Sequence, residues 1–383
     1  MRGYRLPVRL LGVPLRLDPS FLLILPLLAW LIASQIPAYV ALMSEAGVAL
    51  DQEALTQGVT PALLGLVAAT GLFVGVLLHE LGHVLVARFY GVQAEEITLW
   101  FLGGVASFRD LPRGKGAEAI VAVAGPITSM GLALLAGASL EWVQSAGGRF
   151  VLSYLAIANG ALGVFNLLPA LPLDGGRILR SLLALAMGRY AATRVAVGVS
   201  RVVAIGLGVW GFVSLNLLMV AIAFLVYQAG GAEGRMALLE RAFAGKTVRD
   251  LMTPDPATID PDVPLDRFAR LRAFRSHAGY PVVDQDGRLR GFARVLDADV
   301  EEGVPDDATV ADVTVEAETI TPHEPLAQAA TRLATGATGR LVVVDERGSV
   351  VGILSRSDIV RELERLGGPD APGALRGPDG PPP

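Results

Sequence analysis

The sequence contains no cysteine, and only two of its 383 residues are lysine. The absence of cysteine excludes disulfide bonds and thiolate metal ligands, so any metal site must use nitrogen and oxygen donors. Charge is also scarce, because 18% of the residues are charged while 52% are hydrophobic, and the mean hydropathy is +0.51. These values are typical of a protein with several membrane spans. The net charge of -5 and the lack of a basic face argue against a nucleic-acid partner.

Long apolar runs occur almost only in residues 1–230. A helix needs about 20 apolar residues to cross a bilayer, and four runs are long enough: 20–43, 61–87, 118–140 and 150–173. A fifth run, 195–228, is interrupted near 211–216 and predicts two short spans. The sequence therefore predicts about six transmembrane helices.

Arginine is concentrated before the first span and in every second connection, whereas the first loop carries only acidic charge. Positive charge marks the cytoplasmic side of a membrane protein. We therefore expect a multi-pass protein of the cell membrane, in a bacterial inner membrane, with both termini cytoplasmic. The alternative, a cleaved signal peptide over residues 1–38, fits less well because the basic segment is long and the apolar run suits a retained span.

His79, Glu80 and His83 form the pattern H-E-x-x-H inside the second apolar run. Positions i and i+4 share one face of a helix, so both imidazoles can reach one ion with Glu80 beside it. Two histidines suit Zn²⁺, and an adjacent carboxylate can accept a proton from water. The alternative is a pair of core histidines, which leaves Glu80 unpaired at a cost of about 2.5–3.5 kcal/mol. The pattern favours a metal site.

Asp174 is the candidate for the third protein ligand that a catalytic zinc needs. It follows an apolar span in FNLLPALPLDGGR (165–177), where two prolines break the helix and two glycines free the backbone. The alternative is that Asp174 caps the next helix. Beside an H-E-x-x-H pattern in another span, the ligand role is favoured.

The combination of H-E-x-x-H in one span with N-x-x-P-x-x-P-x-D-G in a later one resembles the site-2 proteases, a family of intramembrane zinc metalloproteases. The resemblance covers the whole apolar half, including GVPLRLDPSF (12–21) and Ala-Gly-Pro at 124–126. It implies one zinc ion per chain, bound by His79, His83 and Asp174, with Glu80 as general base and acid.

The resemblance also implies that Asn166 stabilises the tetrahedral oxyanion or positions the substrate. The alternative for Asn166 is a hydrogen bond between helices. The chain departs from the family at Ser129, where many members have asparagine, although serine can still form a hydrogen bond.

The segment ITLWFLGGVASF (97–108) has some alternation, a glycine pair and several β-branched or aromatic residues, which together predict a β-hairpin. The family resemblance suggests that this hairpin dips into the membrane and that the substrate adds to its edge, with Gly103, Gly104 and Val105 as contacts. A transmembrane substrate must unwind before cleavage, and strand addition gives its freed amides new partners. The alternative is a hairpin that only shields the site.

The second half contains an internal repeat. TIDPDVPL (258–265) matches TITPHEPL (319–326), and PVVDQDGRLRGF (281–292) matches LVVVDERGSVVGI (341–353). This region resembles a tandem pair of CBS domains, and the two resemblances together imply the CBS-containing subgroup of the protease family. CBS pairs commonly bind adenine nucleotides such as ATP or AMP, which implies Ser355, Asp358 and, less closely matched, Asp297 as nucleotide contacts. The alternative is a pair that only dimerises, with the aspartates as helix caps.

The expected fold class is a polytopic α-helical membrane protein with a small membrane-associated β-hairpin, joined to a soluble α/β tandem CBS domain. The domains expected along the chain are a protease domain at 1–230, a linker at 231–245, CBS repeats at 246–303 and 304–366, and a disordered tail at 367–383.

The expected function is zinc-dependent intramembrane endopeptidase activity in regulated proteolysis. The expected partners are a membrane-anchored protein substrate, the lipid bilayer, an adenine nucleotide that modulates activity, and a second copy bound through the CBS domains. A CBS-regulated channel or transporter is the main alternative. It needs no glutamate between two histidines and usually shows a repeat among its spans, which is not found here. A third alternative, an inactive scaffold, is disfavoured by the complete ligand set.

Overall fold

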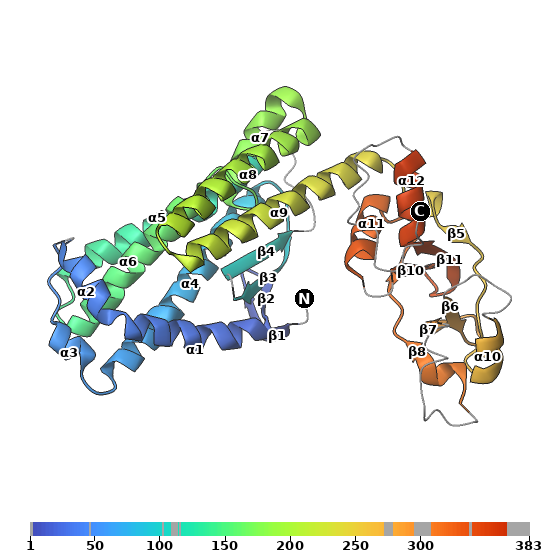
Figure 1. Ribbon diagram of the computed structural model, residues 1–383, viewed down its shortest axis with the longest axis horizontal. Coiled ribbons are helices and arrows are strands. Elements are labelled where there is room, and N and C mark those ends of the chain that lie inside the picture. The colour runs from blue at the N-terminus through green and yellow to red at the C-terminus, as the bar shows by residue number, and fades with distance from the viewer. Residues whose placement is uncertain are drawn as a thin grey trace. The chain divides into compact units, whose positions relative to one another are not determined.

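The computed structural model describes residues 3–45, 47–101, 103–108, 114, 116–271, 279–294, 308–336 and 339–365 (Figure 1). The chain divides into two compact units, Met1–Gly234 and Arg235–Pro383. The division falls within helix α9, so that part of the segment 231–245, the expected linker, is helical.

Five helices of the described residues are long and apolar enough to cross a membrane: α4 (Thr60–Phe89), α5 (Ala117–Ala138), α6 (Ala146–Asn166), α8 (Arg189–Val213) and α9 (Leu217–Ala242). A sixth candidate is a bent pair, α1 (Pro19–Ser34) and α2 (Ile36–Glu45), whose axes differ by 62°. The span predicted over 20–43 therefore consists of two helices with a bend between them. Pro37 has no N–H to continue the helical hydrogen bonds of α1, which explains the break.

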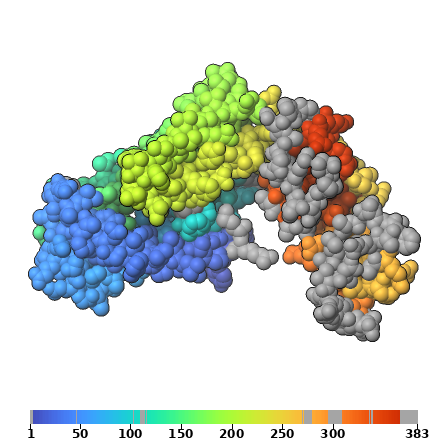
Figure 2. All heavy atoms as spheres, in the orientation of Figure 1, coloured from blue at the N-terminus to red at the C-terminus, as the bar shows by residue number. Residues whose placement is uncertain are grey.

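Two further boundaries differ from the expected spans. Helix α6 ends at Asn166 rather than 173, because the following segment contains two prolines, and the short helix α7 (Asp174–Met187) begins after it. The interruption expected at 211–216 is found at residues 214–216, between α8 and α9. Figure 2 shows α8 and α9, in yellow-green, on the visible face of the first unit, and their exposed side chains include Val202, Ile205 and Phe212.

The predicted hairpin is present as β3 (Ala94–Trp100) and β4 (Gly103–Phe108), which pair antiparallel. It belongs to a four-stranded sheet of order β1-β2-β3-β4, in which β1 (Tyr4–Leu10) and β2 (Val13–Leu17) come from the N-terminal segment. These two strands were not predicted from the sequence. Among the described strands β4 lies at the edge of this sheet. Its position in a membrane stays a prediction.

Small residues let the helices of the first unit approach closely. A Cβ on Gly65 of α4 would lie 2.1 Å from the carbonyl oxygen of Ala29 in α1, and one on Gly82 would lie 2.4 Å from Oγ1 of Thr128 in α5. Such contacts are typical of helices packed within a membrane, where side-chain burial alone provides little driving force. Helix α4 is thereby fixed between α1 and α5. The connections are short elements, α3 (Gln52–Thr56) and a 3₁₀ turn, η1 (Ser139–Glu141).

The second unit contains two small sheets that exchange their first strands. Thr253–Pro254 (β5), from the first repeat, pairs with β11 (Val350–Ser355) of the second, and Thr314–Val315 (β8) pairs with β7 (Leu289–Arg294) of the first. The remaining elements are β6 (Gly279–Val283), β9 (Thr319–Ile320), β10 (Arg340–Val344), α10 (Leu265–Leu271), α11 (Leu326–Thr335), α12 (Arg356–Arg365), η2 (Val248–Asp250) and η4 (Val310–Val313).

The repeat contains the sequence D-x-x-G twice, at 284–287 and 345–348, and both copies form turns. The Asp284 carboxylate accepts from the backbone N–H groups of Asp286 and Arg288, and Asp345 accepts in the same way from Arg347 and Ser349. The repeat seen in the sequence is therefore a repeat of structure.

Candidate functional site

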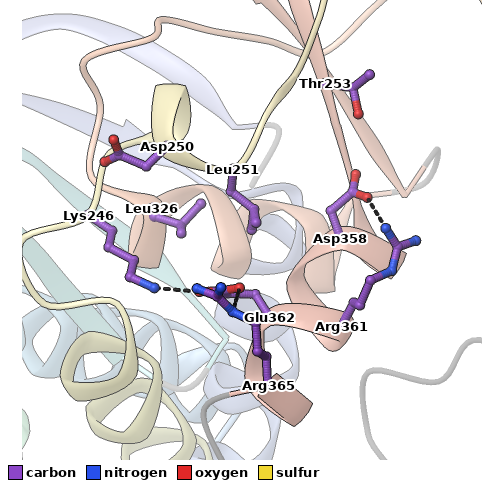
Figure 3. A pocket seen from close by; sticks show the side chains of 9 residues that line it. All are labelled: Lys246, Asp250, Leu251, Thr253, Leu326, Asp358, Arg361, Glu362 and Arg365. Atoms are coloured by element: carbon purple, nitrogen blue, oxygen red, sulfur yellow. Dashed lines mark hydrogen bonds and ion pairs between the residues drawn. The ribbon is translucent and has the colours of Figure 1, made fainter.

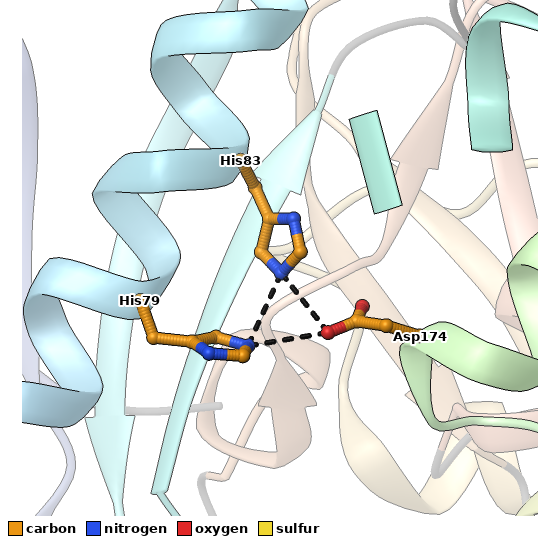
Figure 4. Close-up of side chains that lie close together, drawn as sticks. All are labelled: His79, His83 and Asp174. Atoms are coloured by element: carbon orange, nitrogen blue, oxygen red, sulfur yellow. Dashed lines mark hydrogen bonds and ion pairs between the residues drawn. The ribbon is translucent and has the colours of Figure 1, made fainter. Parts of the chain in front are cut away.

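His79, His83 and Asp174 converge on one point inside the first unit (Figure 4). The two histidines project from α4 and the aspartate from the start of α7, and all three are at most 6% exposed. Nε2 of His79 and Nε2 of His83 each lie 3.2 Å from Oδ2 of Asp174, and the two nitrogens are 3.3 Å apart. Residues 95 positions apart in the chain thus form a compact group of three donor atoms.

The triangle of donor atoms fits a tetrahedral metal ion. Zinc binds histidine nitrogen and carboxylate oxygen at about 2.0–2.2 Å, and tetrahedral angles then separate the ligand atoms by about 3.3–3.5 Å. The observed separations of 3.2–3.3 Å are close to this value. Three protein ligands leave the fourth position of a tetrahedron open, as in catalytic zinc sites.

The second nitrogen of each imidazole is also bonded. Nδ1 of His83 lies 2.8 Å from the Val121 carbonyl oxygen, which can only accept, so Nδ1 carries the proton and Nε2 offers its lone pair to a metal. Nδ1 of His79 lies 2.9 Å from Oγ of Ser129. Both partners belong to α5. This helix therefore orients the two ligands that α4 supplies.

Gly125 brings the backbone of α5 directly against the metal-binding nitrogens. A Cβ at this position would lie 2.3 Å from Nε2 of His83 and 2.6 Å from Nε2 of His79. No side chain fits there without moving an imidazole, which gives a physical reason for the glycine of the Ala-Gly-Pro sequence.

Asp174 is the first residue of α7, and the N-cap is Leu173, which makes no side-chain cap bond. The Asp174 carboxylate is directed to the histidines, so capping does not account for this residue. The two glycines that follow allow the preceding loop to fold onto the helix start: a Cβ on Gly175 would lie 2.2 Å from the Leu167 carbonyl oxygen, and one on Gly176 would lie 2.3 Å from the Leu171 nitrogen.

Glu80 points from α4 to the sheet. Its Oε2 accepts a hydrogen bond of 3.0 Å from the backbone N–H of Ala106 in β4. A Cβ on Gly104 would lie 2.7 Å from Cγ of Glu80, so the glycine is required by this close approach. Gly103 and Gly104, which the sequence presents as a hairpin signal, lie within β4, and Gly104 is the one beside Glu80.

The other sequence candidates lie as follows. The side-chain nitrogen of Asn166 donates to the carbonyl oxygen of Leu162, one turn earlier in the same helix, at 3.0 Å. Gly103, Gly104 and Val105 occupy the edge strand β4. Asp297 lies outside the described residues.

Ser355 and Asp358 form a reciprocal cap at the start of α12. The Asp358 carboxylate accepts from the Ser355 N–H at 2.9 Å, and the Ser355 hydroxyl accepts from the Asp358 N–H at 3.4 Å. Asp358 also lines a cleft of about 600 Å³ in the second unit (Figure 3). The other lining residues are Lys246, Asp250, Leu251, Thr253, Leu326, Arg361, Glu362 and Arg365.

Charged groups of this cleft are already paired. Glu362 bonds to the Lys246 ammonium and, at 2.9 Å, to Arg365, and these two cations hold the pKa of Glu362 below its usual value. Arg361 lies 3.7 Å from Asp358. A ligand phosphate in the cleft would compete with carboxylates for these cations.

The sequence did not reveal three features of the first unit. The Val121 carbonyl and the Ala106 N–H are backbone groups, which any residue supplies, so no residue type marked them. The third omission is a buried ion-pair network around Arg180, whose members are spread over three helices. Ser129 was noticed only as a departure from a family pattern.

Two family models match separate regions of the chain. The sequence model of Peptidase family M50 matches residues 67–147 and 141–209, and that of the CBS domain matches 248–298 and 310–365. The chain is similar to zinc metalloprotease MJ0392 of Methanocaldococcus jannaschii, with 34% identity over 297 residues, which are 77% of this chain and 84% of that protein.

Two solved structures resemble separate parts of the chain. The site-2 protease from Methanocaldococcus jannaschii aligns with 61% of this chain and 96% of its own, at 29% identity and a TM-score of 0.44. CBSX2 from Arabidopsis thaliana, solved in complex with AMP, aligns with 32% of this chain and 98% of its own, at 26% identity and a TM-score of 0.29.

Proposed function

This chain belongs to peptidase family M50, the site-2 protease family of zinc metalloproteases, and we propose that it cleaves a membrane-anchored protein within the bilayer. The observation that carries the proposal is the triangle of donor atoms from His79, His83 and Asp174, with separations of 3.2–3.3 Å. Its members lie among helices apolar enough to span a membrane.

In this proposal His79, His83 and Asp174 hold the zinc. When bound, zinc acts as a Lewis acid that polarises a carbonyl and makes water nucleophilic at neutral pH. Val121 and Ser129 keep the imidazole rings in the orientation that presents Nε2 to the ion. Burial of the three ligands excludes competing water and strengthens their electrostatic interaction with the ion.

Glu80 is the proton carrier. Its Oε2 is bonded to the Ala106 N–H, so Oε1 is the oxygen assigned to accept a proton from the attacking water and return it to the leaving amine. The hydrogen bond to Ala106 fixes the carboxylate against the edge strand β4. Asn166 stays a proposed oxyanion or substrate contact, which requires its amide to leave the Leu162 carbonyl.

The substrate is proposed to extend along β4. The Ala106 N–H points away from β3, and Gly104, two residues earlier, shares this direction in an antiparallel ladder. An added strand would therefore bond to the backbone around Gly103–Val105 and pass directly over Glu80. Strand addition supplies partners for the amides of an unwound transmembrane segment.

Glu80→Gln tests this function. The amide keeps an oxygen for the Ala106 N–H but cannot accept a proton at neutral pH, so cleavage of a membrane-anchored substrate should fall at least a hundredfold. The zinc content, measured by mass spectrometry, should stay at one per chain. His79→Ala should lose both zinc and activity, whereas Glu141→Gln, an exposed control, should keep both. Substantial proteolysis by Glu80→Gln would refute the role of Glu80.

The CBS unit is proposed to bind an adenine nucleotide and to modulate proteolysis. Support comes from the CBS family match and from the cleft that Asp358 lines. Asp358 is proposed to accept the ribose hydroxyls, with Ser355 nearby and Asp297 at the equivalent position of the first repeat. The cations that now pair with Glu362 are suited to phosphate.

Nucleotide binding can be measured by equilibrium dialysis of the full chain with radiolabelled ATP and AMP. Asp358→Asn keeps an oxygen for the Ser355 N–H but removes the charge and one acceptor oxygen, so affinity should fall about tenfold. Asp345→Asn, in a turn outside the cleft, should bind as the native chain does. Equal affinities for both variants and the native chain would place the nucleotide elsewhere. The CBS unit is also the proposed contact between two copies in a homodimer.

A further inference from the structure

Arg180 is a buried cation that the proposed chemistry does not use. It is 6% exposed and lies on α7, six residues after Asp174. Its Nη2 pairs with Glu118 in the first turn of α5, and its Nη1 donates to Glu233 of α9 at 2.8 Å. One guanidinium therefore ties α7 to two neighbouring helices.

Helix α5 also orients the histidines. Glu118, Val121, Gly125 and Ser129 are spaced by three or four residues and lie along one stripe of the helix. Glu118 pairs with Arg180. The Val121 carbonyl bonds to His83 and the Ser129 hydroxyl to His79, while Gly125 lies against both imidazoles. The Glu118–Arg180 pair therefore joins the helix that orients two ligands to the helix that carries the third.

Helix α7 is rigid, so a restraint on Arg180 also restrains Asp174 at its start. Six residues of α-helix span about 9 Å, so fixing Arg180 relative to α5 also fixes where Asp174 stands along α7. A second contact reinforces the alignment, because the Ala119 N–H donates to Oγ of Ser181 at 3.2 Å. A further restraint on Asp174 is the preceding loop, in which the Leu171 N–H donates to Ser200 of α8 at 2.7 Å.

A buried ion pair contributes little net stability, because desolvation offsets much of its Coulomb energy. The ion pair can nevertheless fix the relative position of the helices that it joins. A guanidinium presents several N–H groups in a fixed plane, so it can bridge two carboxylates at once in one orientation, which a lysine ammonium at the end of a flexible stem cannot reproduce. Arg180 can thus hold α7 in one position relative to α5 and α9, and we call this bridge the clamp.

We propose that Arg180, through Glu118 and Glu233, is a positioning residue that sets the Asp174 carboxylate at the bonding distance from the two histidines. The inference rests on the proposed zinc protease function. Arg180 is not one of the three proposed zinc ligands and is proposed to act through the placement of α7.

Arg180→Lys tests the clamp, because it keeps the charge but loses the planar bridge. Zinc affinity of the purified full chain, measured by chelator competition, should fall ten- to hundredfold, as for other residues that support metal ligands. The absorption bands of the Co²⁺-substituted protein should shift, and kcat should fall while KM stays unchanged. Arg189→Lys is the matched control: Arg189 also contacts Glu118, at 3.4 Å, but is exposed. It should leave all three measurements as in the native chain.

A second variant separates positioning from folding. The triple change Glu118→Gln, Arg180→Met, Glu233→Gln removes the charges together, which avoids leaving a buried charge without a partner. It should unfold at nearly the native temperature and still bind zinc at least tenfold more weakly. Native zinc affinity in Arg180→Lys or in the folded triple variant would overturn the proposal. Failure of both variants to fold would make Arg180 a structural residue and overturn it as well.

These outcomes differ from failure of the proposed function itself. In that case the native chain would neither bind zinc at one per chain nor cleave a membrane-anchored substrate, whichever residue stands at position 180.

Discussion

At the scale of single residues, the site is built as much by the absence of side chains as by their presence. Gly125 and Gly104 leave room for the imidazoles and for Glu80, and a Cβ at either position would lie within 2.7 Å of a functional side chain. Ser129 completes the orientation of His79 with one short hydroxyl. The metal-ligand candidates can be recognised in the sequence by their residue types and spacing. The supporting residues can be recognised only from the side chains that they contact in the folded structure.

Gly125→Ala should abolish metal binding. The new Cβ would collide with Nε2 of both histidines, so we expect zinc content close to zero and no proteolysis. Gly131→Ala and Gly137→Ala are controls in the same helix, since among the described residues nothing outside that helix backbone approaches either position within 4 Å. They should keep zinc and raise stability by up to about 1 kcal/mol each. A full complement of zinc in Gly125→Ala would show that the histidines bind metal in another arrangement.

At the scale of elements, the site is formed by three helices, each with a different role. Helix α4 supplies His79 and His83, α7 supplies Asp174, and α5 holds all of them in relation to one another. Strand β4 adds the edge at which Glu80 is bonded. Because the substrate is proposed to use the same edge, β4 links the position of the base to the position of the peptide.

Ala106→Pro should impair the positioning of Glu80 by β4 without affecting metal binding. Proline removes the N–H that Glu80 accepts, at an edge-strand position where proline is tolerated. A hydrogen bond to a charged group contributes about 1.5–3 kcal/mol, so kcat should fall ten- to hundredfold while zinc content is unchanged. Ala106→Ser keeps the N–H and should retain activity. Unchanged kcat in the proline variant would mean that Glu80 does not depend on β4.

At the scale of the whole molecule, a membrane protease unit and a CBS unit share one chain. The division between them falls in α9, which runs from Leu217 to Ala242 without a break. Beyond the division, Leu239 and Phe243 belong to the core of the second unit, together with Leu326 and Ile359. The segment expected as a linker is thus partly core.

Membrane orientation can be tested because the native chain has no cysteine to react. Single substitutions at exposed positions, Gln57→Cys before α4 and Ser214→Cys between α8 and α9, should react with a membrane-impermeant maleimide in intact cells. Asp286→Cys, in the turn of the first CBS repeat, should react only after the cells are broken. The opposite pattern would reverse the predicted orientation, in which both termini are cytoplasmic.

Much of this protein could be read from its sequence. Apolar runs at bilayer length, the i, i+4 spacing of His79 and His83, and a repeat at a constant offset each depend on local periodicity, which a sequence displays directly. Asp174 needed one more step, because it became a ligand candidate only through a second motif in another span. The bend between α1 and α2, by contrast, was not predicted although Pro37 is visible in the sequence, since the apolar run continues past it.

The sequence by itself therefore determined the kinds of residue that can bind zinc, the number of apolar segments and the presence of a CBS pair. Only the tertiary structure decided that the three donor atoms stand 3.2–3.3 Å apart, that α5 orients the histidines, and that Arg180 joins α7 to α5 and α9. The physical reason is that these are contacts between segments distant in the chain. Several use backbone carbonyl and N–H groups, which all residues share and which acquire a partner only when the helices pack.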